Sequence, residues 1–479
     1  MPTLSSGISV ALQAVLTHSQ VLEITEHNIA NASTPGYRRQ SALLTAATPS
    51  SITGSDHGLG AGQRGGGVAI ERIQRFNLEF FDGRYRAVSA ETSNWGTQKE
   101  ILTQLEPMLA ETTEDGLLPK LDQFWAGWQA LATDPTNTAL RTMLLDDATS
   151  LTNAFNRRSS QITQLRADQN LVVGSQVDEI NALATQVAQF NGEISRVLSV
   201  GEQPNDLMDK RDLALDRLAE LTGAVSFPQK NGEVMVSVGG HVLVVGHDAL
   251  KLHTQANTTD TSILDVYWED NQKLIPPSGE LKGTLEVRDQ VLANQLSGLN
   301  TLALGLKTQV NDIHKTGFGL NNATQIDFFT GTGAGDLTVN PLLDAASIAT
   351  SGSLSQPGNN TIALQLAGLK TVKGMKTGTA TMNEYYNAQI TELGFLTKRA
   401  SDNSYQNGLV ATALGDQRES VAGVSLDEEA ANMARAQKAY QAAARVLTAY
   451  DEMLNVIINN MGLLDDNENK ELACASQTG

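Results

Sequence analysis

The amino-acid sequence predicts a mainly α-helical protein with a small β domain, and three observations lead to this fold class. Apolar residues recur at seven-residue steps near both chain ends, a pattern typical of coiled-coil helices. Long helical patterns lie on both sides of a central segment, and that segment carries short β-branched runs separated by glycine-containing turns. The predicted architecture is therefore nested and discontinuous: long terminal coiled-coil helices enclose a helical-bundle middle, which encloses a β insertion.

The clearest helix is the C-terminal one, from about Ser425 to Met461. Its first apolar series steps by seven and comprises Leu426, Met433, Tyr440, Leu447, Leu454 and Met461. The companion series, three residues further on, comprises Ala436, Ala443, Tyr450, Ile457 and Leu464. Ser425 is placed to act as N-cap, Glu428 completes a capping box, and Gly462 can end the helix. Such a helix would be about 54 Å long, and its apolar face must be buried against another helix.

A second terminal helix is predicted from about Leu4 to Ala30. Along it the residues that step by seven are Ile8, Val15, Leu22 and Ile29. Two end helices with such seams can pair, and chain termini commonly lie close together in folded domains. We therefore predict that these four residues form an assembly interface together with Leu426, Met433, Tyr440, Leu447, Leu454 and Ile457.

A corner motif follows the N-terminal helix and reads Asn28-Ile29-Ala30-Asn31-Ala32-Ser33-Thr34-Pro35-Gly36-Tyr37. Pro35-Gly36 predicts a type II turn, because proline presets φ at its own position and glycine accepts a positive φ at the next. The asparagine side chains can satisfy carbonyl groups that are left free at the helix end.

The middle of the chain is predicted to be helical at 84–110, 117–132, 137–200 with breaks and 206–221, again from about Thr284, and over 381–419. In the helix after Thr284 another apolar series steps by seven, formed by Leu285, Leu292, Leu299, Leu306 and Ile313. Trp125 and Trp128 lie three residues apart and are expected in the core. Between the helices, β-branched runs over 224–275 predict strands, with Asn231-Gly232 and Gly239-Gly240 as hairpin turns.

No catalytic, cofactor or metal site is predicted. The glycine-rich stretches 58–67 and 331–335 lack the strand–helix context of a phosphate-binding loop. His241, His247 and His253 lie six residues apart, but Gly246 interrupts the strand and no carboxylate cluster accompanies them. No activated serine or cysteine arrangement is recognisable, so we expect a protein that is not an enzyme.

Composition excludes several classes of protein. The formal net charge of −19 argues against a binder of nucleic acid or of anionic membranes. A single cysteine, Cys474, excludes an internal disulfide framework. No apolar run reaches the roughly 18 residues that span a bilayer, and the N-terminus has no basic segment followed by a cleavage site. If the protein leaves the cytoplasm, it therefore needs another export route.

The predicted domains follow from these elements. Residues 1–60 and 420–462 form the terminal coiled-coil domain, and 61–223 with 281–419 form the helical middle domain. Residues 224–280 form the β insertion domain, and 463–479 are expected to be a disordered acidic tail.

Several of these motifs resemble those of known flagellar proteins. The segment from Asn28 to Tyr37 resembles the N-terminal motif shared by flagellar rod, hook and first hook-associated proteins, with Asn31, Pro35, Gly36 and Tyr37 as motif residues. Residues 422–447 are similar to their C-terminal motif. Two internal segments, 205–212 and 310–317 with the following Asp327-Phe328-Phe329, narrow the resemblance to the family of the first hook-associated protein, FlgK. The resemblance covers nearly the whole chain.

This resemblance implies a structural subunit of the bacterial flagellum that forms the junction between hook and filament and is required for flagellum assembly and motility. It implies self-assembly into a ring of identical subunits, with the hook protein and the third hook-associated protein as neighbours. A flagellar export chaperone on the C-terminal helix is a further implied partner, whereas nucleic acid binding and membrane insertion are not implied. The implied location is extracellular, at the hook–filament junction, reached by flagellar type III export without a cleaved signal peptide.

The same end motifs leave an alternative open, namely another flagellar axial protein such as a hook or rod subunit. Longer members of the resembled family carry a further β domain about where 328–378 lies here, so that domain is expected to be missing or vestigial. The tail with Cys474 runs past the usual end of the family's C-terminal helix.

Overall fold

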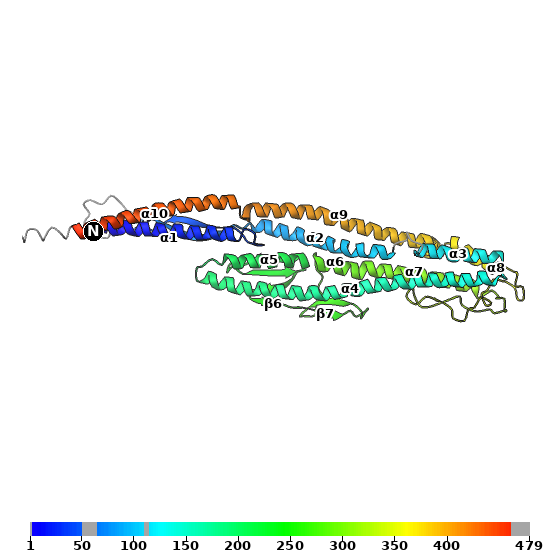
Figure 1. The fold of residues 1–479 in the computed structure, drawn as a ribbon. Helices are drawn as coiled ribbons and strands as arrows, with labels where there is room; N and C mark the ends of the chain where they lie inside the picture. The colour runs from blue at the N-terminus through cyan, green and yellow to red at the C-terminus, as the bar shows by residue number, and fades with distance from the viewer. Residues whose placement is uncertain (1, 50–64, 110–114, 461–479) are drawn as a thin grey trace, which may run out of the picture.

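A computed structural model describes residues 2–49, 65–109 and 115–460. Most of the glycine-rich stretch 58–67, the predicted helix end at Met461 and Gly462, Leu464, and the tail with Cys474 lie outside these residues. The described chain is a long rod of helices, with both of its end helices at the same tip (Figure 1).

The two terminal helices pair along their length, as their seven-residue patterns predict. Helix α1 (Pro2–Ala30) and helix α10 (Leu426–Asn460) run antiparallel, since Asn28 lies beside Glu429 while Gly7 lies against Tyr450. Strands β1 (Gln40–Ala46) and β2 (Val68–Arg75) form an antiparallel hairpin with a bulge between Leu43 and Leu44. The hairpin lies on α1, where the Thr17 hydroxyl donates to the Val68 carbonyl oxygen at 3.1 Å.

The middle of the rod is a helical bundle whose helices agree with the predicted ranges to within about five residues, but the breaks expected within 137–200 are absent, since Thr138–Ser199 is one continuous helix. Its long helices are α2 (Glu79–Leu105), α3 (Leu117–Thr133), α4 (Thr138–Ser199), α5 (Asn205–Thr222), α7 (Leu292–His314) and α9 (Met382–Ala422). Two shorter helices, α6 (Glu280–Glu286) and α8 (Thr361–Gly368), complete it. Helix α2 pairs with α9, and α4 runs through nearly the whole bundle (Figure 1).

Helix boundaries are set by local capping. Asn137 caps α4 by accepting from the amides of Ala139 and Leu140, and Thr381 and Glu384 form a complete capping box at α9. At α10 only half of the predicted box is present. The amide of Glu428 lies 3.4 Å from the Ser425 hydroxyl oxygen, but the Glu428 carboxylate pairs with Arg39 at 2.7 Å instead of returning to the cap. The Glu428–Arg39 ion pair takes the place of the predicted cap contact, and it joins α10 to the segment just before β1.

The β segment folds as short antiparallel strands. Strands β3 (Val225–Pro228), β4 (Val234–Val238), β5 (His241–Val245) and β6 (Asp248–Ala249) form one sheet in that order, and β7 (Leu252–Ala256) pairs with β8 (Leu264–Trp268). Gly232, Gly239 and Gly240 have positive φ, which confirms both predicted hairpin turns. Two further short strands, β9 (Phe329–Thr330) and β10 (Thr338–Val339), pair with each other further along the chain.

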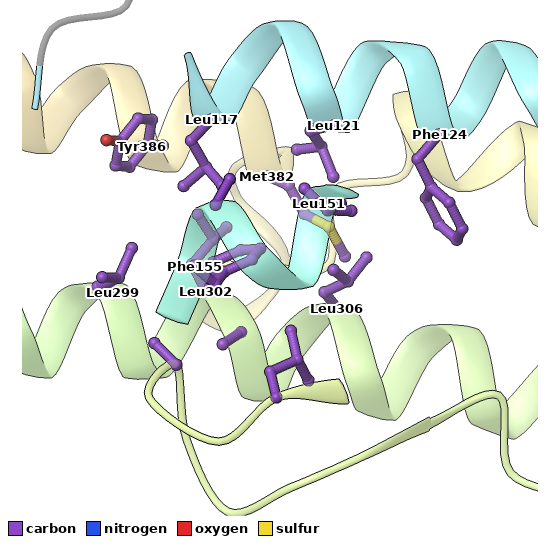
Figure 2. Close-up of a cluster of buried hydrophobic side chains, with 14 of the residues drawn as sticks. Leu117, Leu121, Phe124, Leu151, Phe155, Leu299, Leu302, Leu306, Met382 and Tyr386 are labelled. Atoms are coloured by element: carbon purple, nitrogen blue, oxygen red, sulfur yellow. The ribbon is translucent and has the colours of Figure 1, made fainter. Parts of the chain in front are cut away.

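Apolar side chains gather in two separate clusters. We call them the first core, formed by α2, α3, α7, α8, the start of α4 and the start of α9, and the second core, formed by the rest of α4, α5, α6 and the strands of 234–268. In the first core Leu302 and Leu306 of α7 face Phe155 of α4 and Leu121 of α3 (Figure 2). Trp125 and Trp128 are both buried there, as predicted. The strands are therefore packed directly on α4 and α5.

His314 ends α7 inside the first core and is held as a neutral imidazole. Its Nδ1 lies 2.7 Å from the Ile326 carbonyl oxygen, so this nitrogen carries the proton, and Nε2 accepts from the Ala349 amide at 3.0 Å. Burial lowers the pKa of His314 to about 4, and the bond to Ile326 and the charge of Asp327 oppose this only in part. The unfolded chain therefore binds a proton at this residue more readily than the folded chain does.

We predict that the free energy of unfolding falls as the pH is lowered from about 6.5 to about 4, with His314 contributing about 3 kcal/mol of that loss. Urea denaturation across this range measures it. His314→Gln should flatten the dependence, whereas His247→Gln at an exposed position should leave it unchanged. Equal pH dependence in the wild type and in His314→Gln would contradict this account of the core histidine.

Candidate functional site

The terminal helix pair is the candidate assembly surface, and its seam residues are covered only in part. All eight predicted residues other than Leu426 and Tyr440 are half-buried, namely Ile8, Val15, Leu22, Ile29, Met433, Leu447, Leu454 and Ile457. Leu426 and Tyr440 remain 56% and 37% exposed. Pairing of α1 with α10 therefore leaves part of the predicted interface uncovered, and Leu426 is exposed because it lies in the first turn of α10, where α1 ends.

A further stripe of exposed apolar side chains lies on the same pair. On α10 it comprises Val446, Met453 and Val456, each about half exposed, and on α1 it comprises Leu12 and Leu16. Soluble monomers rarely leave such side chains in a row without a covering surface. Both helices of the pair thus retain exposed apolar surface.

Asn28 is the polar centre of the corner motif, and the predicted set of motif residues did not include it. It is buried and uses each side-chain group: Nδ2 donates to the Gln40 carbonyl at 2.8 Å and to Glu429 at 3.0 Å. Its Oδ1 accepts from the Tyr37 hydroxyl at 2.8 Å and from the Gln40 amide at 3.0 Å. One side chain therefore joins α1, the turn, β1 and α10.

The named motif residues lie around Asn28. Asn31 Nδ2 donates to the His27 carbonyl oxygen at 3.0 Å and so satisfies a helix-end carbonyl, as predicted. Gly36 has φ of +78° and packs against Leu213, while Pro35 is exposed. Burial raises the pKa of Tyr37, and the nearby carboxylates add to this, so its hydroxyl stays protonated and can donate to Asn28.

A cluster of buried ion pairs, which we call the junction cluster, connects this terminal unit to the middle bundle. It consists of Arg38, Arg75, Arg86, Arg418, Asp82, Asp209, Asp212 and Asp216. Arg38 precedes β1 and Arg75 ends β2, whereas the aspartates at 209, 212 and 216 lie on one face of α5. The remaining members come from α2 and α9, so five segments meet here.

Asp212 is the centre of the junction cluster. Its carboxylate lies 2.5 Å from Arg75 and 3.4 Å from both Arg38 and Arg86. Burial alone would raise the pKa of Asp212, but the charges of Arg75, Arg38 and Arg86 outweigh it and lower the pKa to about 2. Asp212 is therefore charged at any ordinary pH.

The other contacts extend the junction cluster to α2 and α9. Arg38 binds Asp82 through two hydrogen bonds of 2.9 and 2.8 Å and also contacts Asn77. Arg418 of α9 bridges Asp82 at 2.9 Å and Asp216 at 2.7 Å. Buried charges are costly unless they are fully paired, and these contacts supply the pairing. The sequence signal was the spacing of three aspartates at helical intervals in 209–216, with arginines near both strands.

No catalytic arrangement emerges from these sites. Within residues 2–49, 65–109 and 115–460, no group of three or more His, Cys, Asp or Glu could hold a metal ion. His241 is stacked on Trp268 with ring centroids 5.3 Å apart. No helix in the described part of the chain is both long and apolar enough to cross a membrane.

We predict that Asp212→Asn lowers the free energy of unfolding by about 3 kcal/mol or more, because three guanidinium groups lose a buried counter-charge. Hydrogen exchange should show the loss first in α1 and α10. Asp206→Asn, an exposed acid on the same helix, is the matched control and should cost less than about 1 kcal/mol. In the wild type, the contribution of Asp212 should disappear as the pH falls from about 4 to about 2. Similar stabilities of the two variants would contradict this role.

Comparison with known proteins agrees with this architecture. The sequence model of the flagellar hook-associated protein FlgK helical domain matches residues 102–329, and the model of the flagellar basal body rod FlgEFG protein C-terminal region matches residues 417–461. The flagellar hook-associated protein 1 of Bacillus subtilis (strain 168) is 28% identical, with 95% of this chain and 98% of that protein covered. The protein of the same name from Escherichia coli (strain K12) is 26% identical, with 95% and 100% covered.

A solved structure supports the fold. The flagellar hook junction protein FlgK from Burkholderia pseudomallei superposes with a TM-score of 0.63 at 17% identity, covering 71% of this chain and all of that one. The helical middle, the C-terminal helix and the near full-length similarity to two hook-associated proteins point to one family. These comparisons support the identification of this chain with the FlgK hook-associated proteins, to which it is similar over nearly its whole length.

Proposed function

We propose that this protein is a structural subunit of the bacterial flagellum that forms the junction between hook and filament and is required for flagellum assembly. Similarity to the FlgK hook-associated proteins supports this role, and that family is one of structural rather than catalytic proteins. The observation in the molecule that carries the proposal is the terminal helix pair. Its half-covered seam and its exposed stripe at Val446, Met453 and Val456 need further helices to cover them.

A subunit at a junction along the flagellar axis must bind its own copies and the components on either side of it. Self-association and contacts with hook and filament components are the general expectation for the family. In finer detail, we propose a ring of identical subunits between the hook protein and the third hook-associated protein, with the predicted seam residues as the assembly interface. An export chaperone on α10 would cover its apolar side chains before assembly, because such a surface otherwise promotes aggregation.

The location is the flagellum. We further propose that the chain reaches the extracellular junction through flagellar type III export without cleavage of a signal peptide. The proposed domains keep the ranges given by the sequence: 1–60 with 420–462, 61–223 with 281–419, and 224–280. The packing of β4 and β5 on α4 and α5 suggests that the last of these depends on the middle domain for its stability.

The test of function is deletion followed by complementation in a flagellated host. Loss of the protein should leave hooks intact while unassembled filament subunits appear in the medium, and the wild-type chain should restore filaments. The alternative, a hook or rod subunit, is favoured by the match of residues 417–461 to the rod-protein C-terminal model. That role predicts missing or truncated hooks instead, and labelling of isolated hook–basal bodies would place the subunit below the hook end.

We predict that Leu447→Asp abolishes assembly while the middle bundle stays folded. Leu447 is half-buried in the seam of α10, and a charge there costs about 2–3 kcal/mol in every subunit of a ring. Circular dichroism should show a folded monomer, whereas motility should be lost and filament subunits should accumulate in the medium.

The matched control is Leu171→Asp, the same change at an exposed position of α4. It should leave motility and filament number close to wild type. Normal motility in the Leu447→Asp strain would show that the seam is not an assembly interface.

A further inference from the structure

The two apolar cores of the bundle meet but do not merge, although one unbroken helix passes through both. On α4 the last buried apolar residue of the first core is Leu165, and the first of the second core is Val173. Between them the buried inward position is occupied by Gln169. A band of buried or half-buried polar side chains crosses the bundle at this level, and we call it the polar layer: Asn94, Gln98, Gln169, Asn170, Glu286 and Arg288.

The polar layer coincides with a π-helical turn, Val287–Val291, between α6 and α7. Arg288 in this turn is fully buried and pairs with Asp289 at 2.7 Å. It also donates to Asn170 of α4 at 3.0 Å and to the Leu264 carbonyl of β8 at 2.8 Å. The Arg288 carbonyl accepts from Arg166 at 3.3 Å. The arginine thus links the helix after the turn to α4 and to a strand of the second core.

The opposite side of the layer is formed by α2. Gln98 donates to Asn94 at 2.9 Å and to Glu286 at 2.7 Å, so α2 contacts α6 here through amide and carboxylate groups. On either side of this level the contacts are apolar: Leu102 and Leu105 of α2 belong to the first core, Leu281 of α6 belongs to the second, and α4 contributes apolar residues to both. At the level itself, α2, α4 and α6 make their contacts through polar groups.

Apolar contact is non-directional and sums over the buried area, whereas each hydrogen bond adds only about 0.5–1.5 kcal/mol net. A level held by polar groups therefore couples its two sides less strongly than a continuous core would. A π-turn inside a helix also interrupts the regular hydrogen-bond ladder at the same place. Local unfolding in proteins follows cooperative units with separate opening free energies.

We propose that the polar layer is a joint between two independently cooperative halves of the bundle, one built on each core. The first half opens without the second, and the second without the first, although α4 is continuous through both. This property belongs to the isolated chain and does not depend on its role in the flagellum.

Native-state hydrogen exchange of the full-length protein tests the joint with two matched variants. Ile162 and Ile180 are both fully buried on α4, one in each core. The reporters are amides away from α4: those of 299–310 for the first half, and those of 214–221 and 234–244 for the second.

Ile162→Ala should speed exchange through opening of the first half about 30-fold or more, and should leave the second half within about twofold of wild type. Ile180→Ala should give the reciprocal result. If either alanine variant fails to fold, Ile162→Val and Ile180→Val provide the same comparison with an expected change of about threefold. Equal acceleration of both halves by either substitution would overturn the proposal, since it would show one cooperative unit.

Discussion

The structure depends on the contact between the acidic face of α5 and the arginines that flank the β1–β2 hairpin. No apolar cluster among the described residues joins the terminal helices to the bundle, so the junction cluster fixes their relative position. Asp212 is central because Arg38, Arg75 and Arg86 converge on it. Ion pairs of this kind contribute less to stability than to geometry, since desolvation of the charges offsets much of their attraction. Ion pairs require a defined arrangement of the charged groups, whereas an apolar contact does not.

The corner motif and the junction cluster form one continuous polar unit. Gln40 accepts a hydrogen bond from Asn205 at the start of α5, and its amide binds Asn28 at the end of α1. Arg38, two residues earlier, enters the junction cluster. The short segment after the turn therefore carries side chains to both the terminal pair and the bundle. This explains why a sequence that looks like a simple helix-to-strand corner contains so many polar residues.

Much of the fold could be predicted from the sequence, because seven-residue periodicity and turn residues are local signals. The helix ranges, both terminal helices and the hairpin turns of the β segment followed from them. The junction cluster did not, because Arg38 and Asp82 are 44 residues apart and Arg75 and Asp212 are 137 apart. Single residues at such separations leave no periodic pattern. The π-turn was also missed, since the step from Leu285 to Leu292 keeps its seven-residue spacing across it. Asn28 looked like one asparagine of two in the sequence, because its three partners, Tyr37, Gln40 and Glu429, are brought together only by the fold.

The chain passes between the bundle and the terminal pair twice, and the two passages lie side by side. One runs from the end of β2 into α2, and the other is the three-residue link Gly423–Ser425 between α9 and α10. The amide of Phe76 donates to the carbonyl oxygen of Arg39 at 3.0 Å, and the amide of Arg39 donates to the carbonyl oxygen of Ala422 at 2.8 Å, so Arg39 ties the two passages together. A torque applied to the terminal helices is therefore shared by two tethers in parallel rather than carried by a single flexible strand.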